Sequence, residues 1–323
     1  MLKQLFLSVV LLFTLIFMAD TAQASSSIEL RRANKLLAAK KYQEAYQEYI
    51  RIAEKGRNPI AIVTVALFHE LGWGRKVDNV QACQWYEKAA ELDVPLAVSN
   101  LAKCIENNIY QDQDYARAAQ LYQKAADLGY HLALCHLGEL YLHGKGLEQN
   151  SEKGLQLCEQ AALKGSVPAM LNIADFNLAL NTTRANLSAL HWYSVAASYQ
   201  SAPAQFSLGT MLLEGQGIAQ DPLEAREWFE KAAAQGFQPA YYQTARLYYG
   251  APKDPATGLW TEHDLAKSYL WISAALKRSK NQALSKELNT MLNNVKAGMP
   301  PTWEANLTQK LETHLAQFPT VVD

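Results

Sequence analysis

Small and hydrophobic side chains recur along this chain with a period of 35 or 36 residues. An alanine stands once in every period, and a second small residue stands five positions after it. The two columns are Ala61, Ala97, Ala133, Ala169, Ala204 and Ala240, and Ala66, Ala102, Gly138, Ala174, Gly209 and Ala245. Self-similarity at such a period indicates a repeat architecture, in which each unit buries its apolar face against its neighbours.

Each period predicts two antiparallel helices, which we name helix A and helix B. Helix A begins near the first-column alanine, and apolar residues follow it four and seven positions later, as with Ala133, Leu137 and Leu140. This spacing makes one stripe on a helix of 3.6 residues per turn. Helix B carries a large apolar column at Trp85, Leu121, Leu157, Trp192, Trp228 and Trp271. Small residues between the helices allow their close approach.

Start and stop signals agree with this period. Helix A is expected to end at glycine, as in the turns at 72–74, 144–146 and 215–217, because glycine adopts left-handed backbone easily. The expected N-cap residues of helix B are Asp78, Asp114, Asn150, Asp221 and Asp264. Two units depart from the glycine turn, at 107–108 and 179–181, and the last unit carries about seven extra residues around 251–260.

At this point the chain resembles the Sel1-like repeat family, which is related to tetratricopeptide repeats. The resemblance rests on Ala133-x3-Leu137-Gly138-x-Leu140-Tyr141-x2-Gly144-x-Gly146 and on Trp228-Phe229-Glu230-Lys231-Ala232-Ala233-x2-Gly236. It implies an all-α fold, a right-handed superhelical solenoid of antiparallel helix pairs. Six repeats are expected, at approximately 57–92, 93–128, 129–164, 165–199, 200–235 and 236–278.

The segments outside the repeats have their own expected roles. Residues 25–56 resemble an opening tetratricopeptide-like hairpin, and residues 279–323 are predicted to hold C-terminal capping helices and a tail. Residues 1–24 are predicted to be a signal peptide, with Lys3 before an apolar run at 5–18 and Ala22-Gln23-Ala24 before the cleavage point. The alternative is an uncleaved anchor, but the run is short for a membrane span. We expect a periplasmic or secreted chain that is not inserted in a membrane.

Composition and motifs limit the function. Lys and Arg number 30 against 31 Asp and Glu, so no cationic excess favours nucleic acid as a partner. The sequence contains no Ser-x-x-Lys, Gly-x-Ser-x-Gly, Walker or His-Glu-x-x-His motif. We therefore expect a protein that is not an enzyme and that uses no cofactor. The alternative, taken from exported Sel1-type proteins, is a β-lactam or cell-wall-fragment binding protein with weak hydrolase activity.

One cluster on helix A resembles a metal site. His136, Glu139 and His143 stand at i, i+3 and i+7, and two imidazoles with a carboxylate could hold zinc. Positions i and i+7 lie about 10 Å apart along a helix, which is too far for one ion. A solvated helix face is the preferred interpretation, and no metal site is predicted.

The four cysteines leave two interpretations open. Antiparallel stacking places Cys83 near the height of Cys104, and Cys135 near Cys158 with a larger offset, so these pairs could form disulfides. The cysteine-rich branch of the family places its cysteines at the end of helix B and the start of the next helix A. Here Ala90 and Ala97 occupy such places. Four thiols acting as small buried hydrophobes remain the alternative.

A column of polar residues marks the expected binding face. The third position after each first-column alanine is polar in every unit, and the sixth position adds charges of both signs. The predicted site consists of Thr64, Asn100, Lys103, His136, Glu139, Asn172, Asp175, Ser207, Gln243 and Arg246. Amides and mixed charges suit a peptide or protein better than a polyanion. The predicted function is that of an exported scaffold or adaptor, a monomer or weak oligomer, that binds a protein or peptide on its concave face.

Overall fold

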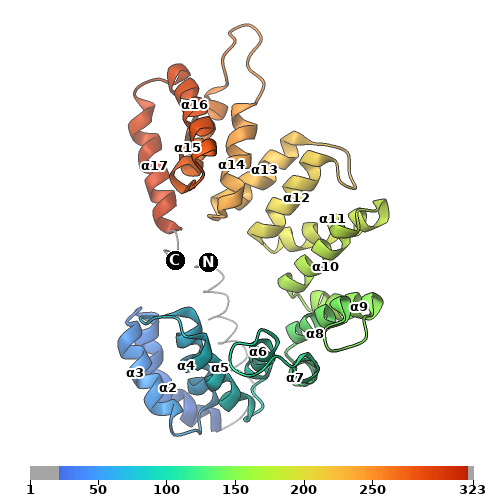
Figure 1. Ribbon diagram of the computed structural model, residues 1–323. Coiled ribbons are helices and arrows are strands. Elements are labelled where there is room, and N and C mark those ends of the chain that lie inside the picture. Colours follow the sequence, from blue (N-terminus) through green and yellow to red (C-terminus); the bar gives the residue numbers. More distant parts are fainter. Residues whose placement is uncertain (1–21, 319–323) are drawn as a thin grey trace. The chain divides into compact units, whose positions relative to one another are not determined.

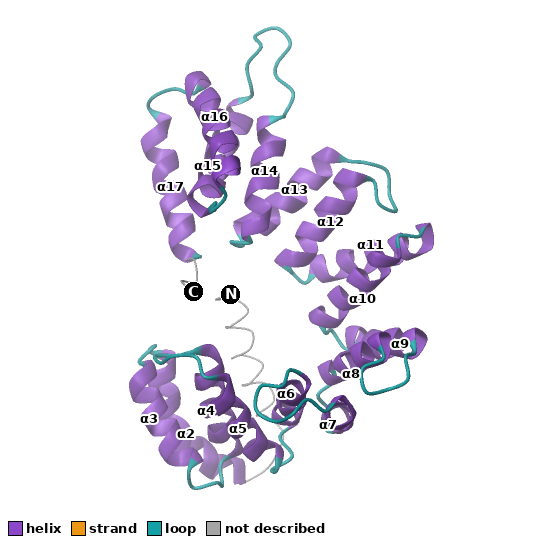
Figure 2. Cartoon of the chain, viewed as in Figure 1, coloured by secondary structure: helices purple, strands orange, loops and turns teal. Residues whose placement is uncertain are grey.

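The structure, a computed structural model, describes residues 22–318, and within this range every regular element is a helix (Figures 1 and 2). Contacts divide the chain into two compact units, with the boundary between Ala169 and Met170 inside helix α10. We describe each unit by itself. No helix in the described range is long and apolar enough to span a bilayer.

The first unit consists of helical hairpins in which each helix packs against the next one along the chain. Its core includes two clusters of alanines, aromatic rings and aliphatic side chains, and both clusters include residues of α5 and α6. Its helices are α2 (Ala22–Ala38), α3 (Tyr42–Ala53), α4 (Pro59–Leu71), α5 (Asn79–Ala90), α6 (Pro95–Glu106), α7 (Tyr115–Asp127), α8 (Leu132–His143) and α9 (Ser151–Leu163), followed by the start of α10 (Val167–Leu180).

The second unit continues the same pattern from within α10. Its helices are α11 (Thr183–Ser198), α12 (Ala202–Glu214), α13 (Pro222–Ala234), α14 (Gln238–Tyr249), α15 (Glu262–Arg278), α16 (Gln282–Gly298) and α17 (Trp303–Gln317). Both α16 and α17 pack against α15. Leu307, Leu311 and Leu315 of α17 are buried, so the amphipathic C-terminal segment covers the apolar face that the last hairpin would otherwise expose.

The periodic small residues lie where the helices come closest. All six first-column alanines have no exposed surface. Gly138 on α8 faces Gly154 on α9, and a Cβ added to Gly138 would lie 2.5 Å from the Gly154 carbonyl oxygen. A larger residue in either place would therefore force the two helices apart.

Most of the predicted N-caps are present. The side chains of Asp78, Asp114, Asn150 and Asp221 accept hydrogen bonds from backbone amides in the first turn of helix B. The prediction for Asp264 was wrong, because α15 begins at Glu262 and its N-cap is Thr261, about one turn earlier. The Thr261 hydroxyl accepts the Asp264 amide and donates to the Asp264 carboxylate, so the two residues form a reciprocal capping pair.

The two glycines of each turn have different roles. Gly144 ends α8 in left-handed backbone (φ 64°), as Gly72 and Gly215 end α4 and α12. Gly146 instead packs against the start of helix B in the preceding repeat, where its Cβ would lie 2.4 Å from Cβ of Tyr115. In the two units that lack glycine, Asn108 (φ 53°) and Asn181 (φ 47°) adopt the left-handed conformation, which asparagine tolerates better than most residues.

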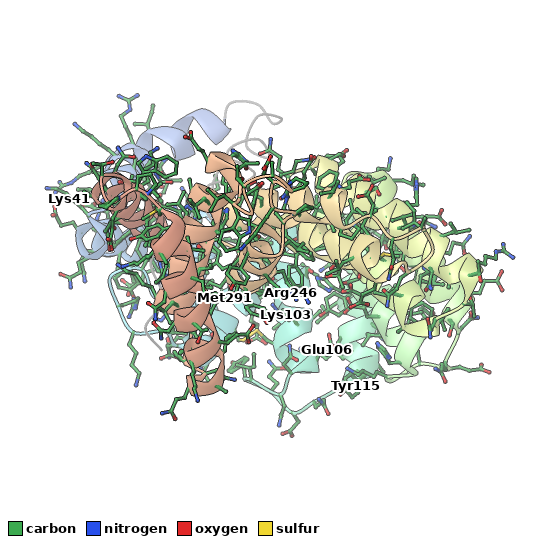
Figure 3. All side chains as sticks on the ribbon, turned by 90° about the horizontal axis from the view of Figure 1, so that it is seen from above. Lys41, Lys103, Glu106, Tyr115, Arg246 and Met291 are labelled. Atoms are coloured by element: carbon green, nitrogen blue, oxygen red, sulfur yellow. A yellow bond between two sulfur atoms is a disulfide. The ribbon has the colours of Figure 1, made fainter. Side chains whose placement is uncertain are left out.

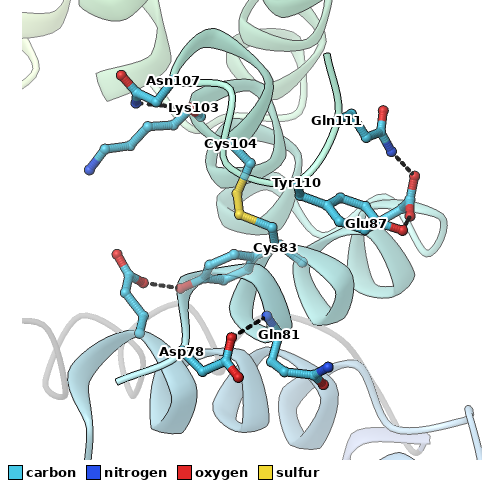
Figure 4. The surroundings of a disulfide bond; sticks show 11 residues. Asp78, Gln81, Cys83, Glu87, Lys103, Cys104, Asn107, Tyr110 and Gln111 are labelled. Atoms are coloured by element: carbon cyan, nitrogen blue, oxygen red, sulfur yellow. Dashed lines mark hydrogen bonds between the residues drawn. A yellow bond between two sulfur atoms is a disulfide. The ribbon is translucent and has the colours of Figure 1, made fainter. Parts of the chain in front are cut away.

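All four cysteines form disulfides in the structure. Their pairing is the one that the sequence analysis considered as the alternative to four free thiols. Cys83 of α5 bonds to Cys104 of α6, the helix that opens the next repeat, with 6.0 Å between Cα atoms (Figure 4). Cys135 of α8 bonds to Cys158 of α9, with 4.0 Å between Cα atoms. The facing glycines, Gly138 and Gly154, allow α8 and α9 this close approach.

Substituting the second glycine of a turn tests the packing between repeats. We expect Gly146→Ala to lower the free energy of unfolding by roughly 1–2 kcal/mol for the left-handed backbone and by about 1–3 kcal/mol more for the contact with Tyr115. Gly165→Ala is the matched control, because its φ is +86° and no atom lies within 4 Å of the added Cβ. Thermal unfolding followed by circular dichroism measures both, and equal losses would contradict the packing role.

Candidate functional site

The predicted polar column follows the helix A of each repeat. In the first unit it lies on α4, α6 and α8, and in the second unit on α10, α12 and α14. Lys103, Asp175 and Arg246 are exposed, while Asn100, His136, Glu139, Asn172, Ser207 and Gln243 are half-buried. The half-buried members lie at the edge between helix packing and solvent.

Thr64 departs from the prediction of a surface contact. Its residue is 3% exposed, and its hydroxyl donates to the Ile60 carbonyl one turn earlier on α4 at 2.7 Å. This bond satisfies the hydroxyl within its own helix. We therefore leave Thr64 out of the candidate site.

Asn100 borders a buried tyrosine. Tyr86 of α5 is 2% exposed, and its hydroxyl donates to the Glu70 carboxylate at the end of α4. The Asn100 side chain on α6 is a further polar neighbour of the Tyr86 hydroxyl and acts to lower its pKa. Three successive helices thus contribute one polar group each to a single contact.

The next repeat has the same arrangement with other residue types. The Tyr122 hydroxyl of α7 donates to Glu106 of α6 at 2.9 Å, and the ring of His136 on α8 lies 5.2 Å from the Tyr122 ring. Lys145 extends toward Glu106, with 3.7 Å between Nζ and Oε1. The tyrosine hydroxyl is again held by the acid of the preceding helix.

A third example lies in the second unit. The Tyr193 hydroxyl of α11 donates to the Asp175 carboxylate on α10, and Ser207 on α12 is a further polar neighbour that acts to lower the pKa of Tyr193. We name these three sets the tyrosine triads, and they consist of Glu70–Tyr86–Asn100, Glu106–Tyr122–His136 and Asp175–Tyr193–Ser207. Each joins two helices of one repeat to helix A of the next one.

The triads keep their tyrosines protonated. Burial raises the pKa of Tyr86 well above its usual value, and the Glu70 carboxylate beside it raises the pKa further. The pKa of Tyr122 is raised mainly by burial and further by Glu106. The pKa of Tyr193 is raised mainly by burial and further by Asp175. A neutral hydroxyl that donates to a carboxylate is therefore the stable state at neutral pH.

The exposed members of the face carry charge. Lys103 stands one turn before Glu106 on α6, and both are labelled in Figure 3 with Arg246 of α14. Arg246 donates to Gln243 at 3.2 Å on the exposed side of its helix. The His136 Nδ1 lies 3.9 Å from the Glu139 carboxylate. The face therefore offers cations, carboxylates and amides together.

The cluster around His136 does not assemble a metal site. Glu139 lies near His136, while His143 is exposed at the end of α8. Among the residues that the structure describes, no group of three or more His, Cys, Asp or Glu side chains is placed to hold a metal ion.

Three repeats lack the tyrosine of the triad, since Cys158, Phe229 and Ile272 stand in its place in the third, fifth and sixth repeats. In the third repeat, Cys158 occupies the tyrosine column and bonds to Cys135. In the last hairpin the order is reversed, since Tyr248 of α14 donates at 2.5 Å to Glu230 of α13. Burial raises the pKa of Glu230, but hydrogen bonds from Lys267, Tyr248 and Trp271 outweigh it, and the net pKa is lowered.

The three tyrosines and two of their acids, Glu70 and Glu106, were missed by the sequence prediction, which had included Asp175 in the binding face. Tyr86, Tyr122 and Tyr193 stand one position after the large apolar column, and Glu70 and Glu106 are one period apart. The same period that located the alanines locates these three tyrosines and two glutamates, whereas Asp175 stands six rather than nine positions after its alanine. The rings of these tyrosines fit the apolar stripe of helix B, and the hydrophobic pattern does not indicate where a hydroxyl finds its acceptor.

A comparison with family models identifies the repeat. The model of the Sel1 repeat matches residues 60–94, 95–130, 131–166, 167–198 and 202–237, which together make up more than half of the chain. Each match coincides with one hairpin, from α4–α5 to α12–α13. The hairpin of α14 and α15 lies beyond the last match.

Known proteins are similar over different lengths. Chitin synthase regulatory factor 3 of Schizosaccharomyces pombe is 44% identical over 52 residues, which are 16% of this chain and 6% of that protein. Protective antigen c5321 of uropathogenic Escherichia coli, described as displaying an SLR fold, has a TM-score of 0.60 and 21% identity over 94% of this chain and 66% of its own. A Sel1 repeat protein from Oxalobacter formigenes has a TM-score of 0.59 and 25% identity over 77% of this chain and 100% of its own.

Removing one hydroxyl tests the triads. We expect Tyr122→Phe to lower the free energy of unfolding at pH 7 by about 1–2 kcal/mol, because it removes the hydrogen bond to Glu106. The pKa of Tyr122 is raised in the folded state, so wild-type stability is complete below the unfolded pKa near 10 and falls above it. Tyr122→Phe has no such hydroxyl to ionise. The difference in free energy of unfolding between wild type and the variant should therefore narrow at pH 10.5 and above.

The matched control is Tyr199→Phe, because Tyr199 is 58% exposed at the end of α11. Urea unfolding of the three chains at both pH values measures the effect. A gap between wild type and Tyr122→Phe that stays constant with pH would contradict the raised pKa.

Proposed function

Since the chain belongs to the Sel1-repeat family, we propose that it is an exported scaffold that binds a protein or peptide partner on the polar face of its A helices. Sel1 repeats generally mediate protein–protein interactions, and the family is generally a non-enzymatic helical repeat scaffold. The observation that carries the proposal is the repeated placement of polar side chains at the same position of successive A helices.

The side chains of this face suit an extended peptide. Asn100 and Ser207 are half-buried beside the tyrosine hydroxyls that they border, which limits the side-chain freedom that binding would remove. Lys103 on α6 and Arg246 on α14 are exposed cations, and Glu139 on α8 and Asp175 on α10 supply the opposite sign. Mixed charges favour a partner with its own pattern of both signs over a polyanion.

The disulfides support the proposal of export. Two disulfides in a helical chain are expected where the compartment is oxidising and are rare where thiols are kept reduced. The predicted signal peptide lies almost entirely outside the described residues, and α2 begins at Ala22, two residues before the expected cleavage after Ala24. Cleavage would therefore remove only the first residues of α2.

No observation favours the alternative of a β-lactam or cell-wall hydrolase. That chemistry needs an activated nucleophile beside a general base, and the sequence contains no Ser-x-x-Lys. The tyrosine hydroxyls that lie beside carboxylates have raised pKa values, which makes them poorer nucleophiles. The binding role is therefore the one we propose.

Charge reversal on the A helices tests the binding face. We expect the chain carrying Lys103→Glu and Arg246→Glu to recover about tenfold less partner than wild type from an envelope and secreted fraction of the native host, because repulsion replaces attraction at the interface. Quantitative mass spectrometry of the captured proteins gives the ratio for each one.

The matched control reverses the same charge on the B helices. Lys88 and Lys231 lie over the rings of Trp85 and Trp228, and the pair Lys88→Glu and Lys231→Glu changes the net charge equally. A partner that is retained by the helix A variant and lost by the helix B variant would reject the proposed face.

The intact mass of the chain purified from its native compartment tests export and oxidation together. We expect a mass that begins at Ser25 and is four hydrogen atoms below that of the reduced chain, with no thiol alkylated after denaturation without reductant. A mass that includes residues 1–24 would reject cleavage, and four alkylated thiols would reject the disulfides.

A further inference from the structure

The extra residues of the last hairpin help to line an open cleft. The loop after α14 carries Lys253 and Trp260 over the end of that helix and over α16. Tyr249, Lys253, Trp260, Asn294 and Ala297 line a cleft of about 470 Å³, within the usual range of about 300–1,000 Å³ for ligand sites. The cleft belongs entirely to the second unit and lies beyond the last matched Sel1 repeat.

The loop is held in one conformation by its own hydrogen bonds. The Asp254 carboxylate accepts the amides of Ala256 and Thr257 and the Thr257 hydroxyl. The Asp254 amide donates to the Leu259 carbonyl at 2.8 Å, which closes the loop. These bonds place Lys253 and Trp260 at the two ends of the closed loop and therefore beside each other.

The aromatic floor of the cleft is fixed as well. The Trp260 indole donates to the Tyr249 carbonyl at 3.1 Å, and the two rings lie 5.4 Å apart. Asn294 of α16 donates to the Tyr249 hydroxyl at 2.8 Å. Because the Trp260 N–H is already bonded, the indole offers mainly apolar surface to a ligand, while the Tyr249 hydroxyl keeps its own hydrogen to donate.

Lys253 supplies the charge of the cleft. Its ammonium lies 4.0 Å from the centre of the Trp260 ring, and within the described residues no carboxylate forms an ion pair with it. Asp254, its neighbour in sequence, is engaged by the loop. The five lining residues therefore carry one positive charge and no negative charge.

We propose that this cleft binds an acidic peptide segment of the partner, with a carboxylate on Lys253 and an adjacent aromatic or aliphatic side chain against Trp260. A carboxylate offers the ammonium a stronger interaction than the ring does. A sugar would need several polar groups around the Trp260 ring, and the one polar atom of that ring already donates to the Tyr249 carbonyl. The proposal rests on the proposed function for its class of ligand, and it adds a second contact apart from the A-helix face.

Fluorine NMR of the full chain labelled with 5-fluorotryptophan tests the cleft. The probes are acetylated and amidated tetrapeptides, Leu-Phe-Asp-Glu, its neutral analogue Leu-Phe-Asn-Gln and its basic analogue Leu-Phe-Lys-Lys, with chitotetraose as the sugar. We expect the Trp260 resonance, assigned with Trp260→Phe, to shift saturably with the acidic peptide and at least about tenfold more weakly with the other probes.

Lys253→Gln should weaken binding of the acidic peptide about tenfold. The matched control is Lys231→Gln, because Lys231 lies 3.7 Å over the ring of Trp228 in a similar pair outside the cleft. Its affinity should equal that of wild type, and the Trp228 resonance should not move. Equal binding of the three peptides, a saturable response to chitotetraose alone, no response at Trp260, or unchanged affinity in Lys253→Gln would each overturn the proposal. None of these results would alter capture through Lys103 and Arg246, so the two proposals fail separately.

Discussion

The close approach of neighbouring helices at small residues is the constraint on which this structure depends. A single helical hairpin cannot bury its apolar face, so each repeat must pack against the next one. Ala61, Ala97 and Ala133 have no exposed surface, and Gly146 has no room for even one carbon beside Tyr115. The period of the sequence is therefore the period of the helix contacts, and it tolerates little change in side-chain volume.

The same constraint explains the polar face. Helices that pack this closely bury the tyrosines of helix B, and a buried hydroxyl needs an acceptor. Glu70 and Glu106 provide it from the end of helix A, and the next helix A adds a polar side chain such as Asn100. The residues expected to contact a partner are thus also part of the packing between repeats. This double role accounts for their half-buried positions.

The sequence was sufficient for the repeats, their turns and four of five N-caps, because these depend on local backbone chemistry that repeats in phase. It was insufficient for Thr64 and Asp264. The Thr64 hydroxyl bonds within its own helix, and the Thr261 hydroxyl takes the N-cap role that was predicted for Asp264. The third repeat shows a further limit. There Cys158 replaces the tyrosine, and Gly138 of α8 faces Gly154 of α9. These three residues together explain why α8 and α9 come close enough for the disulfide between Cys135 and Cys158.

Chain-specific chemistry collects where the period is broken. Inside the repeats a buried side chain packs against neighbouring helices on both sides. A new polar group there would need a hydrogen-bond partner already in place. The loop after α14 is free of this requirement, because it satisfies its own backbone through Asp254 and contacts only the last helices. The adjoining cluster around Glu230 differs from the tyrosine triads for the same reason, since Lys267 and Trp271 come from a helix that no further repeat covers. A solenoid of this kind can therefore acquire a new binding site at its last hairpin without disturbing the packing that holds the others together.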